Sequence, residues 1–173
     1  MRKSIRIIVA SALCTGALSS NEKPASAASF GAGVVMRPNF CLKNCSTTVF
    51  SIGPEVSWKY FAFAWRFAFE DGVTYHNPDI RFAYEIPLGP ISVAPLLEFT
   101  PMFGSTSGIS ILQLIIRPGV RVYWKPIPLL ALFVEPFALD VGFYSKVSSG
   151  SFSMTSSDLS LRYHLGFGAA FRF

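Results

Sequence analysis

The stretch DLSLRYHLGFGAAFRF, residues 158–173, contains two alternating sets of residues that differ in kind. One set is apolar throughout and comprises Leu159, Leu161, Tyr163, Leu165, Phe167, Ala169, Phe171 and Phe173. The other set is small, polar or charged and comprises Ser160, Arg162, His164, Gly166, Gly168, Ala170 and Arg172. Because successive side chains of a strand point to opposite faces, the stretch is predicted to be a β-strand with an apolar face and a crowded polar face.

The rest of the chain favours strands that cross a membrane. After residue 27, no stretch has 18 uninterrupted apolar residues, since Arg117 with Pro118 and Glu135 with Pro136 break the best candidates. Transmembrane helices are therefore not expected. A closed barrel is the other way to pair every backbone group in lipid. We predict an all-β fold, an eight-stranded antiparallel up-and-down transmembrane β-barrel.

Alternation of apolar residues places the eight predicted strands. They cover residues 30–40, 46–52, 56–69, 80–86, 91–103, 111–124, about 130–144 and 158–173. Tight turns are predicted at residues 53–54, 87–90 and 125–128, and longer loops at residues 41–45, 70–78, 105–110 and 145–157. Since the tight turns follow every second strand, both termini and these turns are expected in the periplasm.

The seventh predicted strand changes its alternation partway. Leu130, Leu132 and Val134 are apolar at even positions, whereas Leu139, Val141 and Phe143 are apolar at odd ones. One extra residue near Pro136 and Phe137 would restore a single apolar face. A β-bulge is predicted there, because proline inside a strand tends to mark one.

The first 27 residues are typical of a secretory signal. Arg2, Lys3 and Arg6 precede an apolar run at residues 7–18, and residues 25–27 or a site near Ser19 offer small residues for cleavage. We predict a signal peptide at residues 1–27 and the barrel at residues 28–173. A retained anchor is the alternative, as is a lipoprotein acylated at Cys14, although Leu13 does not suit that processing.

Removing this leader lowers the charge. Four of the 15 Lys+Arg residues and one of the 10 Asp+Glu residues lie before Ala28, which leaves a net charge of +2. No basic cluster with interleaved aromatic residues remains, so nucleic acid is not an expected partner. Cys41 and Cys45 stay in the exported chain and are predicted to form a disulfide. A metal site would need four ligands, which no nearby His or second cysteine pair supplies.

The last residues of the chain and the number of predicted strands resemble those of a known family of barrels. The chain ends on Phe173, with Phe171 and Phe167 at alternate positions before it, which is similar to the assembly signal at the end of bacterial outer-membrane barrels. The segment after the leader resembles the small eight-stranded outer-membrane barrels of the OmpA/OmpX type. This resemblance implies export to the bacterial outer membrane as a monomer. The implied partners are outer-membrane lipid, lipopolysaccharide and the barrel-assembly machinery, and no cofactor is implied.

Charged residues on the inward faces are predicted to form a network that plugs the lumen. Counted from the periplasmic ends, Arg66, Arg81, Glu98, Arg117 and Glu135 should form one layer. Glu85 and Arg121 should lie below this layer, and Asp140 and Arg162 above it, with His164 also facing inward. Buried carboxylates are costly unless paired, and the fork of an arginine can satisfy two acceptors.

Three functions are compatible with such a barrel. A structural or surface-interaction role through the loops is the preferred interpretation. A narrow channel or carrier of a small apolar ligand is the alternative, although eight strands leave an interior about filled by side chains. A lipid-modifying enzyme would use His76 or His164. However, Ser160 lies roughly 13 Å along the strand from His164, and His164-Leu165-Gly166 departs from the His-x-Ser pair of lipid A deacylases. We predict that the protein is not an enzyme.

One other fold shares this alternation. A soluble lipocalin-like barrel would have the same period with an apolar interior and a polar exterior. The residues assigned inward are too rich in Gly and Ala for a surface in water.

Overall fold

The computed structural model describes residues 30–45, 49–70, 73–106 and 108–173. The predicted signal peptide, its cleavage sites and Cys14 lie outside the described residues. Within these ranges, the chain contains no helix with the length and apolarity needed to cross a membrane.

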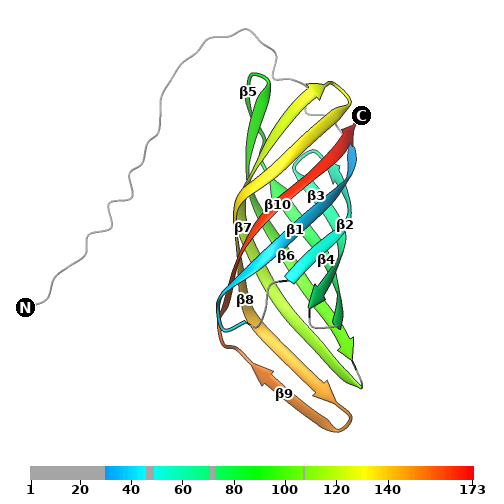
Figure 1. Ribbon diagram of the computed structural model, residues 1–173, viewed down its shortest axis with the longest axis vertical. Helices are drawn as coiled ribbons and strands as arrows, with labels where there is room; N and C mark the ends of the chain where they lie inside the picture. The colour runs from blue at the N-terminus through cyan, green and yellow to red at the C-terminus, as the bar shows by residue number, and fades with distance from the viewer. Residues whose placement is uncertain (1–29, 46–48, 71–72, 107) are drawn as a thin grey trace, which may run out of the picture.

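The described chain is a barrel of antiparallel strands (Figure 1). The ten strands are β1 (Gly31–Lys43), β2 (Val49–Trp58), β3 (Phe61–Glu70), β4 (Val73–Ala83), β5 (Ile86–Leu88), β6 (Ile91–Thr106), β7 (Ile109–Ile127), β8 (Leu130–Ser149), β9 (Phe152–Ser156) and β10 (Ser160–Arg172). Eight of them close the barrel, because β10 pairs with both β1 and β8. The short β5 pairs with β6, and β9 pairs with the far end of β8.

The two ends of the barrel differ. At one end, which we call the turn end, two-residue turns join β2 to β3, β5 to β6 and β7 to β8. The backbones of Phe30 and Phe173 also hydrogen-bond there, with 2.9 Å from the Phe173 nitrogen to the Phe30 oxygen. At the other end, the hairpin end, β8 and β9 extend past the start of β10, while β8 stays paired with β7 as far as Ser149 (Figure 1).

The outer face is apolar and the inner face is not. On β3, Phe61, Phe63, Trp65, Phe67 and Phe69 are exposed, while the intervening Ala and Arg side chains are buried. The same alternation holds on β10, as predicted from its sequence. An interior of buried charges inside an apolar wall excludes the lipocalin-like arrangement, in which the two faces are reversed.

The turn predicted at Gly53-Pro54 is wrong. β2 runs through both residues to Trp58, and the chain reverses at Lys59 and Tyr60. The predicted strand 56–69 is therefore split between β2 and β3. Gly53 is needed for close approach, because a Cβ atom there would lie 2.7 Å from the Arg66 Cα. A Gly-Pro pair reads as a turn in sequence, but here the glycine lets two backbones pack.

The predicted loops at residues 70–78 and 145–157 are also wrong in large part. β4 starts at Val73, and its residues Tyr75, Asn77 and Asp79 point inward and are buried. β8 continues to Ser149, and the serine-rich segment folds back as β9. Polar composition indicated loops, but strands that extend past the lipid can be polar on both faces.

The predicted β-bulge in the seventh barrel strand is confirmed. His164 pairs with Ala138, whereas Gly166, two residues later, pairs with Glu135, three residues earlier. The extra residue therefore lies in β8 at Pro136-Phe137. The Tyr163 hydroxyl donates a hydrogen bond to the freed Pro136 carbonyl at 2.6 Å.

Candidate functional site

The barrel interior holds one continuous set of ion pairs, which we call the central network. It consists of five arginines and five carboxylates: Arg37, Arg66, Arg81, Arg117, Arg121, Glu55, Asp79, Glu98, Glu135 and Asp140. All ten side chains are buried. They come from seven of the eight barrel strands, and β10 adds His164. The period-two alternation brings them together, because every one stands on an inward position of its strand.

Glu98 on β6 is the most connected carboxylate. Arg37 binds it through two nitrogens, at 2.8 Å to Oε1 and 3.0 Å to Oε2. Arg66 donates from Nη2 to Oε1 at 2.9 Å, and Arg117 donates from Nη1 to the same oxygen. Three arginines from β1, β3 and β7 thus meet on one carboxylate, which ties together strands that are not neighbours in the sheet.

A second branch of the central network runs toward the turn end. Arg37 also donates from Nε to Glu135 at 2.6 Å, and Arg121 donates to Glu135 at 2.5 Å. Glu55 accepts hydrogen bonds from two arginines, at 2.6 Å from both terminal nitrogens of Arg81 and at 2.7 and 3.0 Å from those of Arg121. The forks of arginine satisfy most of the carboxylate oxygens in this branch.

The remaining carboxylates lie on the hairpin side of Glu98. Asp79 binds Arg66 and accepts a hydrogen bond from the Thr100 hydroxyl at 2.6 Å. Asp140 binds Arg117, with 3.0 Å between Nη2 and Oδ2. His164 Nδ1 lies 3.1 Å from Asp140 Oδ1, and the His164 side chain is fully buried.

The layers expected from counting residues differ from this arrangement. Arg121 and Asp140, predicted for separate layers, both join the central network. Arg162 lies apart and ion-pairs with Glu70 at 3.3 Å, although Asp140 is its neighbour in the β8–β10 register. Glu85 is also separate. The offset between strands, which a count along each strand does not include, accounts for these differences.

Several network members were missing from the predicted set. Glu55 was hidden by the assumed turn at Gly53-Pro54, and Asp79 bordered the assumed loop at residues 70–78. Arg37, on β1, is also absent from the predicted layers, although it binds both Glu98 and Glu135. The alternation of Tyr75, Asn77, Asp79 and Arg81 on inward positions would have extended β4 and found Asp79.

Glu85 belongs to a small group at the turn end. It lies between β4 and β5, and it accepts hydrogen bonds from Lys125, Ser92 and, at 2.7 Å, Arg172. Burial alone would raise the pKa of Glu85, but these hydrogen bonds outweigh it and hold the pKa below its usual value. This group therefore joins β6, β7 and β10 to the segment between β4 and β5 at the turn end.

Apolar clusters lie on both sides of the central network. Along β6, the inward residues Glu98 and Thr100 stand between Ala94 and Met102. Ala94 belongs to a buried cluster toward the turn end, which contains Val35, Ala94, Tyr123, Ala131, Phe133 and Ala170. Met102 belongs to a second cluster toward the hairpin end, which contains Val49, Ala68, Tyr75, Met102 and Ile115. β7 repeats this order, with Arg117 and Arg121 between Ile115 and Tyr123.

Glycines on β10 make room for this interior. A Cβ atom on Gly166 would lie 2.8 Å from Cδ of Glu135, and one on Gly168 would lie 3.0 Å from Cε1 of Phe133. The guanidinium of Arg121 lies over the Phe133 ring at 3.9 Å, which joins the central network to the apolar cluster at the turn end.

The buried interior charges balance. Six arginines and six carboxylates are buried in the described chain, the two beyond the central network being Arg162 and Glu70. Equal numbers leave no net charge that would favour ions of one sign.

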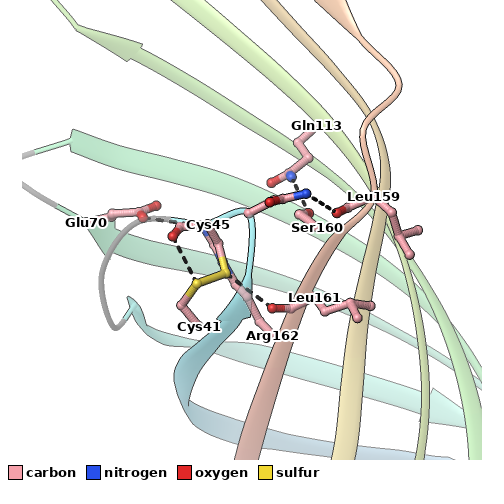
Figure 2. Close-up of a disulfide and its surroundings, with 9 residues drawn as sticks. Cys41, Cys45, Glu70, Gln113, Leu159, Ser160, Leu161 and Arg162 are labelled. Carbon is pink, nitrogen blue, oxygen red and sulfur yellow. Dashed lines mark hydrogen bonds and ion pairs between the residues drawn. A yellow bond between two sulfur atoms is a disulfide. The ribbon is translucent and has the colours of Figure 1, made fainter.

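Cys41 and Cys45 form a disulfide where β1 ends, at the hairpin end (Figure 2). Cys45 Sγ lies 3.2 Å from the Leu161 carbonyl oxygen, and Asn44 donates from Nδ2 to the Leu159 carbonyl at 3.0 Å. Gln113 and Ser160 also hydrogen-bond beside this loop, at 3.1 Å. The disulfide therefore holds the loop against β10, close to the Arg162–Glu70 pair.

We expect no free thiol at either loop cysteine in the purified protein. Incubation with a maleimide under denaturing conditions, without reductant, should leave the peptide containing Cys41 and Cys45 unlabelled in mass spectrometry. Prior reduction should allow both residues to be labelled. Stoichiometric labelling without reductant would contradict the pairing.

The two histidines considered for catalysis lie on different faces. His76 is exposed on the outer wall, where its ring contacts those of Phe67 and Trp65, whereas His164 is buried in the interior. Across the described ranges, no group of three or more His, Cys, Asp or Glu residues is arranged to hold a metal ion.

An apolar wall around a charged, buried interior defines a membrane-spanning, eight-stranded β-barrel. No protein-family model matches this chain, and no curated protein matches it by sequence. Among solved structures, the chain is similar to the Neisserial surface protein A, with 14% identity, a TM-score of 0.46, and 83% of this chain and 96% of that chain covered. It is also similar to a major outer membrane protein from Thermus thermophilus (15% identity, TM-score 0.44, 83% and 98% covered). The N-terminal β-barrel domain of Pseudomonas aeruginosa OprF is similar too (11% identity, TM-score 0.41, 83% and 97% covered).

Proposed function

We propose that the protein is an integral barrel of the bacterial outer membrane whose lumen is closed by side chains and which acts through contacts at its hairpin end. It would be exported by its leader, inserted by the barrel-assembly machinery, and oriented with the turn end in the periplasm. Outer-membrane lipid and lipopolysaccharide would then surround it as a monomer.

The proposal of a closed lumen rests on one observation: the central network has equal numbers of positive and negative charges and lies between two apolar clusters. An ion that crossed the barrel would have to displace paired charges and also pass both apolar clusters. Losing hydration at an apolar layer is costly for an ion, and the arginine forks already occupy the carboxylates that could replace water.

The projecting β8–β9 hairpin supports a role in surface contacts. Its residues Phe152 and Met154 are each about 60% exposed, and they stand on β9, which is an edge strand paired with β8. Exposed apolar side chains on a strand outside the lipid are typical of surfaces that meet a partner. If the interior is closed, the hairpin end is the part of the protein that is available to contact other molecules.

We expect no channel activity from the folded protein. In planar lipid bilayers, the purified barrel should produce no discrete conductance steps, because the interior is filled by the central network and its flanking clusters. A large porin under the same conditions is the positive control, and a heat-modifiable gel band shows that the protein is folded. Regular conductance steps would favour the narrow-channel alternative.

A further inference from the structure

The outer wall changes from apolar to polar at one level on adjacent strands near the hairpin end. On β6, the outward residues are apolar from Ile91 as far as Phe103, and Ser105 is the first polar one. On β7, the change falls between Leu112 and Ser110. A boundary shared by neighbouring strands marks a level along the barrel, since their outward residues face the same surroundings.

Strand register aligns these polar residues in two rows. The first row crosses four strands and contains His76, Phe103, Leu112 and Lys146. The second row lies one outward position farther toward the hairpin end and contains Ser105, Ser110, Ser148 and Ser153, with Thr74 beside Ser105. Between these strands lies a hollow of about 380 Å³. It is lined by Thr74 and by all members of the two rows except Ser153, which is on β9.

Among the described residues that line the hollow, Lys146 carries a positive charge and none is an acid. Lys146 makes no ion pair with any residue in the described ranges, whereas Lys125 is paired with Glu85. Six carboxylates are enclosed in the interior and cannot reach this side of the wall. His76 is held beside the hollow by its edge contacts with the rings of Phe67 and Trp65. The available charge thus favours an anionic ligand.

Strand length places the β6 residues of the two rows, Phe103 and Ser105, near the height of lipid headgroups. Ser105 is fourteen residues beyond Ile91 on β6. At the usual strand rise and a tilt of about 40°, this separation is roughly 35 Å along the barrel axis, compared with an apolar band about 25 Å tall. A ligand seated at this level could place acyl chains on the apolar wall below, over Phe103 and Leu112.

We propose that this hollow binds the headgroup of a phosphorylated glycolipid in the outer leaflet. The Lys146 ammonium would donate hydrogen bonds to a phosphate, and the hydroxyls of Thr74, Ser105 and Ser110 would bond to sugar hydroxyls. Several neutral hydroxyls around one cation fit a sugar phosphate better than a headgroup that is a bare phosphate, which offers no alcohol hydroxyls for them to bond. The inference rests on the orientation proposed above but not on the closed lumen, so lipid binding and conductance are tested separately.

Native mass spectrometry of the folded protein in detergent tests this site, with bisphosphorylated lipid A as the probe. Lys146→Gln should weaken binding about tenfold, as expected for the loss of one charge-assisted hydrogen bond. Lys59→Gln is the matched control, because it removes the same charge at the turn end, and its binding should stay within about twofold of the original. A fully dephosphorylated lipid A should bind the unaltered protein as weakly as the intact probe binds Lys146→Gln.

A second variant keeps the test independent of Lys146. Ser105→Ala with Ser110→Ala should weaken binding of lipid A while leaving binding of phosphatidic acid, an anionic lipid whose phosphate carries no alcohol headgroup, unchanged. Equal binding of lipid A by the Lys146→Gln variant and the original would overturn the proposal. Equal losses in the Lys146→Gln and Lys59→Gln variants would also overturn it, because they would indicate general charge attraction.

Discussion

Replacing Glu98 with alanine should lower the free energy of unfolding by about 3–5 kcal/mol, the cost of removing one partner from a buried ion pair. Glu98 accepts hydrogen bonds from Arg37, Arg66 and Arg117, all of which are fully or almost fully buried. Without this carboxylate, three guanidinium groups from three strands lose a shared partner and repel each other. No other acid in the central network binds three arginines at hydrogen-bonding distance.

Urea unfolding in lipid vesicles, followed by tryptophan fluorescence and by the heat-modifiable gel band, measures this loss. Asp158→Ala is the control, because Asp158 is exposed and its carboxylate hydrogen-bonds to the neighbouring Ser156, and it should change the free energy by at most about 1 kcal/mol. If Glu98→Ala left the unfolding midpoint unchanged and produced new conductance in bilayers, the central network would instead be guarding a pore.

The central network also fixes how the strands are aligned. Its pairs join distant strands, such as Arg37 on β1 with Glu98 on β6, in addition to neighbours. A strand that slipped by one residue would turn its charge toward lipid, and a slip by two residues would separate the charge from its partner. Hydrophobic side chains of similar volume could give equal stability, but they would tolerate such shifts.

Period-two alternation made the barrel predictable from the sequence. Lipid outside and a crowded interior impose opposite demands on successive residues, so β3 and β10 carry a clear pattern along their whole length. Even the bulge at Pro136-Phe137 was recognisable, because one extra residue reverses the alternation. These features are local, and each can be read from a single strand.

The interior and the strand ends were less predictable, because they depend on contacts between strands. The polar segments around Asn77 and Ser153 are predicted to be loops, although Asn77 belongs to β4 and Ser153 to β9. Arg162 stands opposite Asp140 in the register but binds Glu70 across the barrel. The choice of partner depends on the stagger between strands, which no single stretch of sequence contains.

Gly53→Val should destabilise the barrel by about 3 kcal/mol, at the upper end of the usual cost of overpacking. A side chain at Gly53 would lie 2.7 Å from Cα of Arg66 and 2.8 Å from the carbonyl carbon of Trp65, both backbone atoms of β3 that cannot rotate away. Gly89→Ala is the comparison, because Gly89 lies in an open turn where a Cβ atom meets no other atom. Alanine there has only the cost of the backbone conformation, a φ of 70°, which is about 1–2 kcal/mol. Both variants are measured by urea unfolding and by the yield of folded barrel. If Gly53→Val folded as well as the original, Gly53-Pro54 would be a turn outside the sheet, and β2 would not pack against β3 at this point.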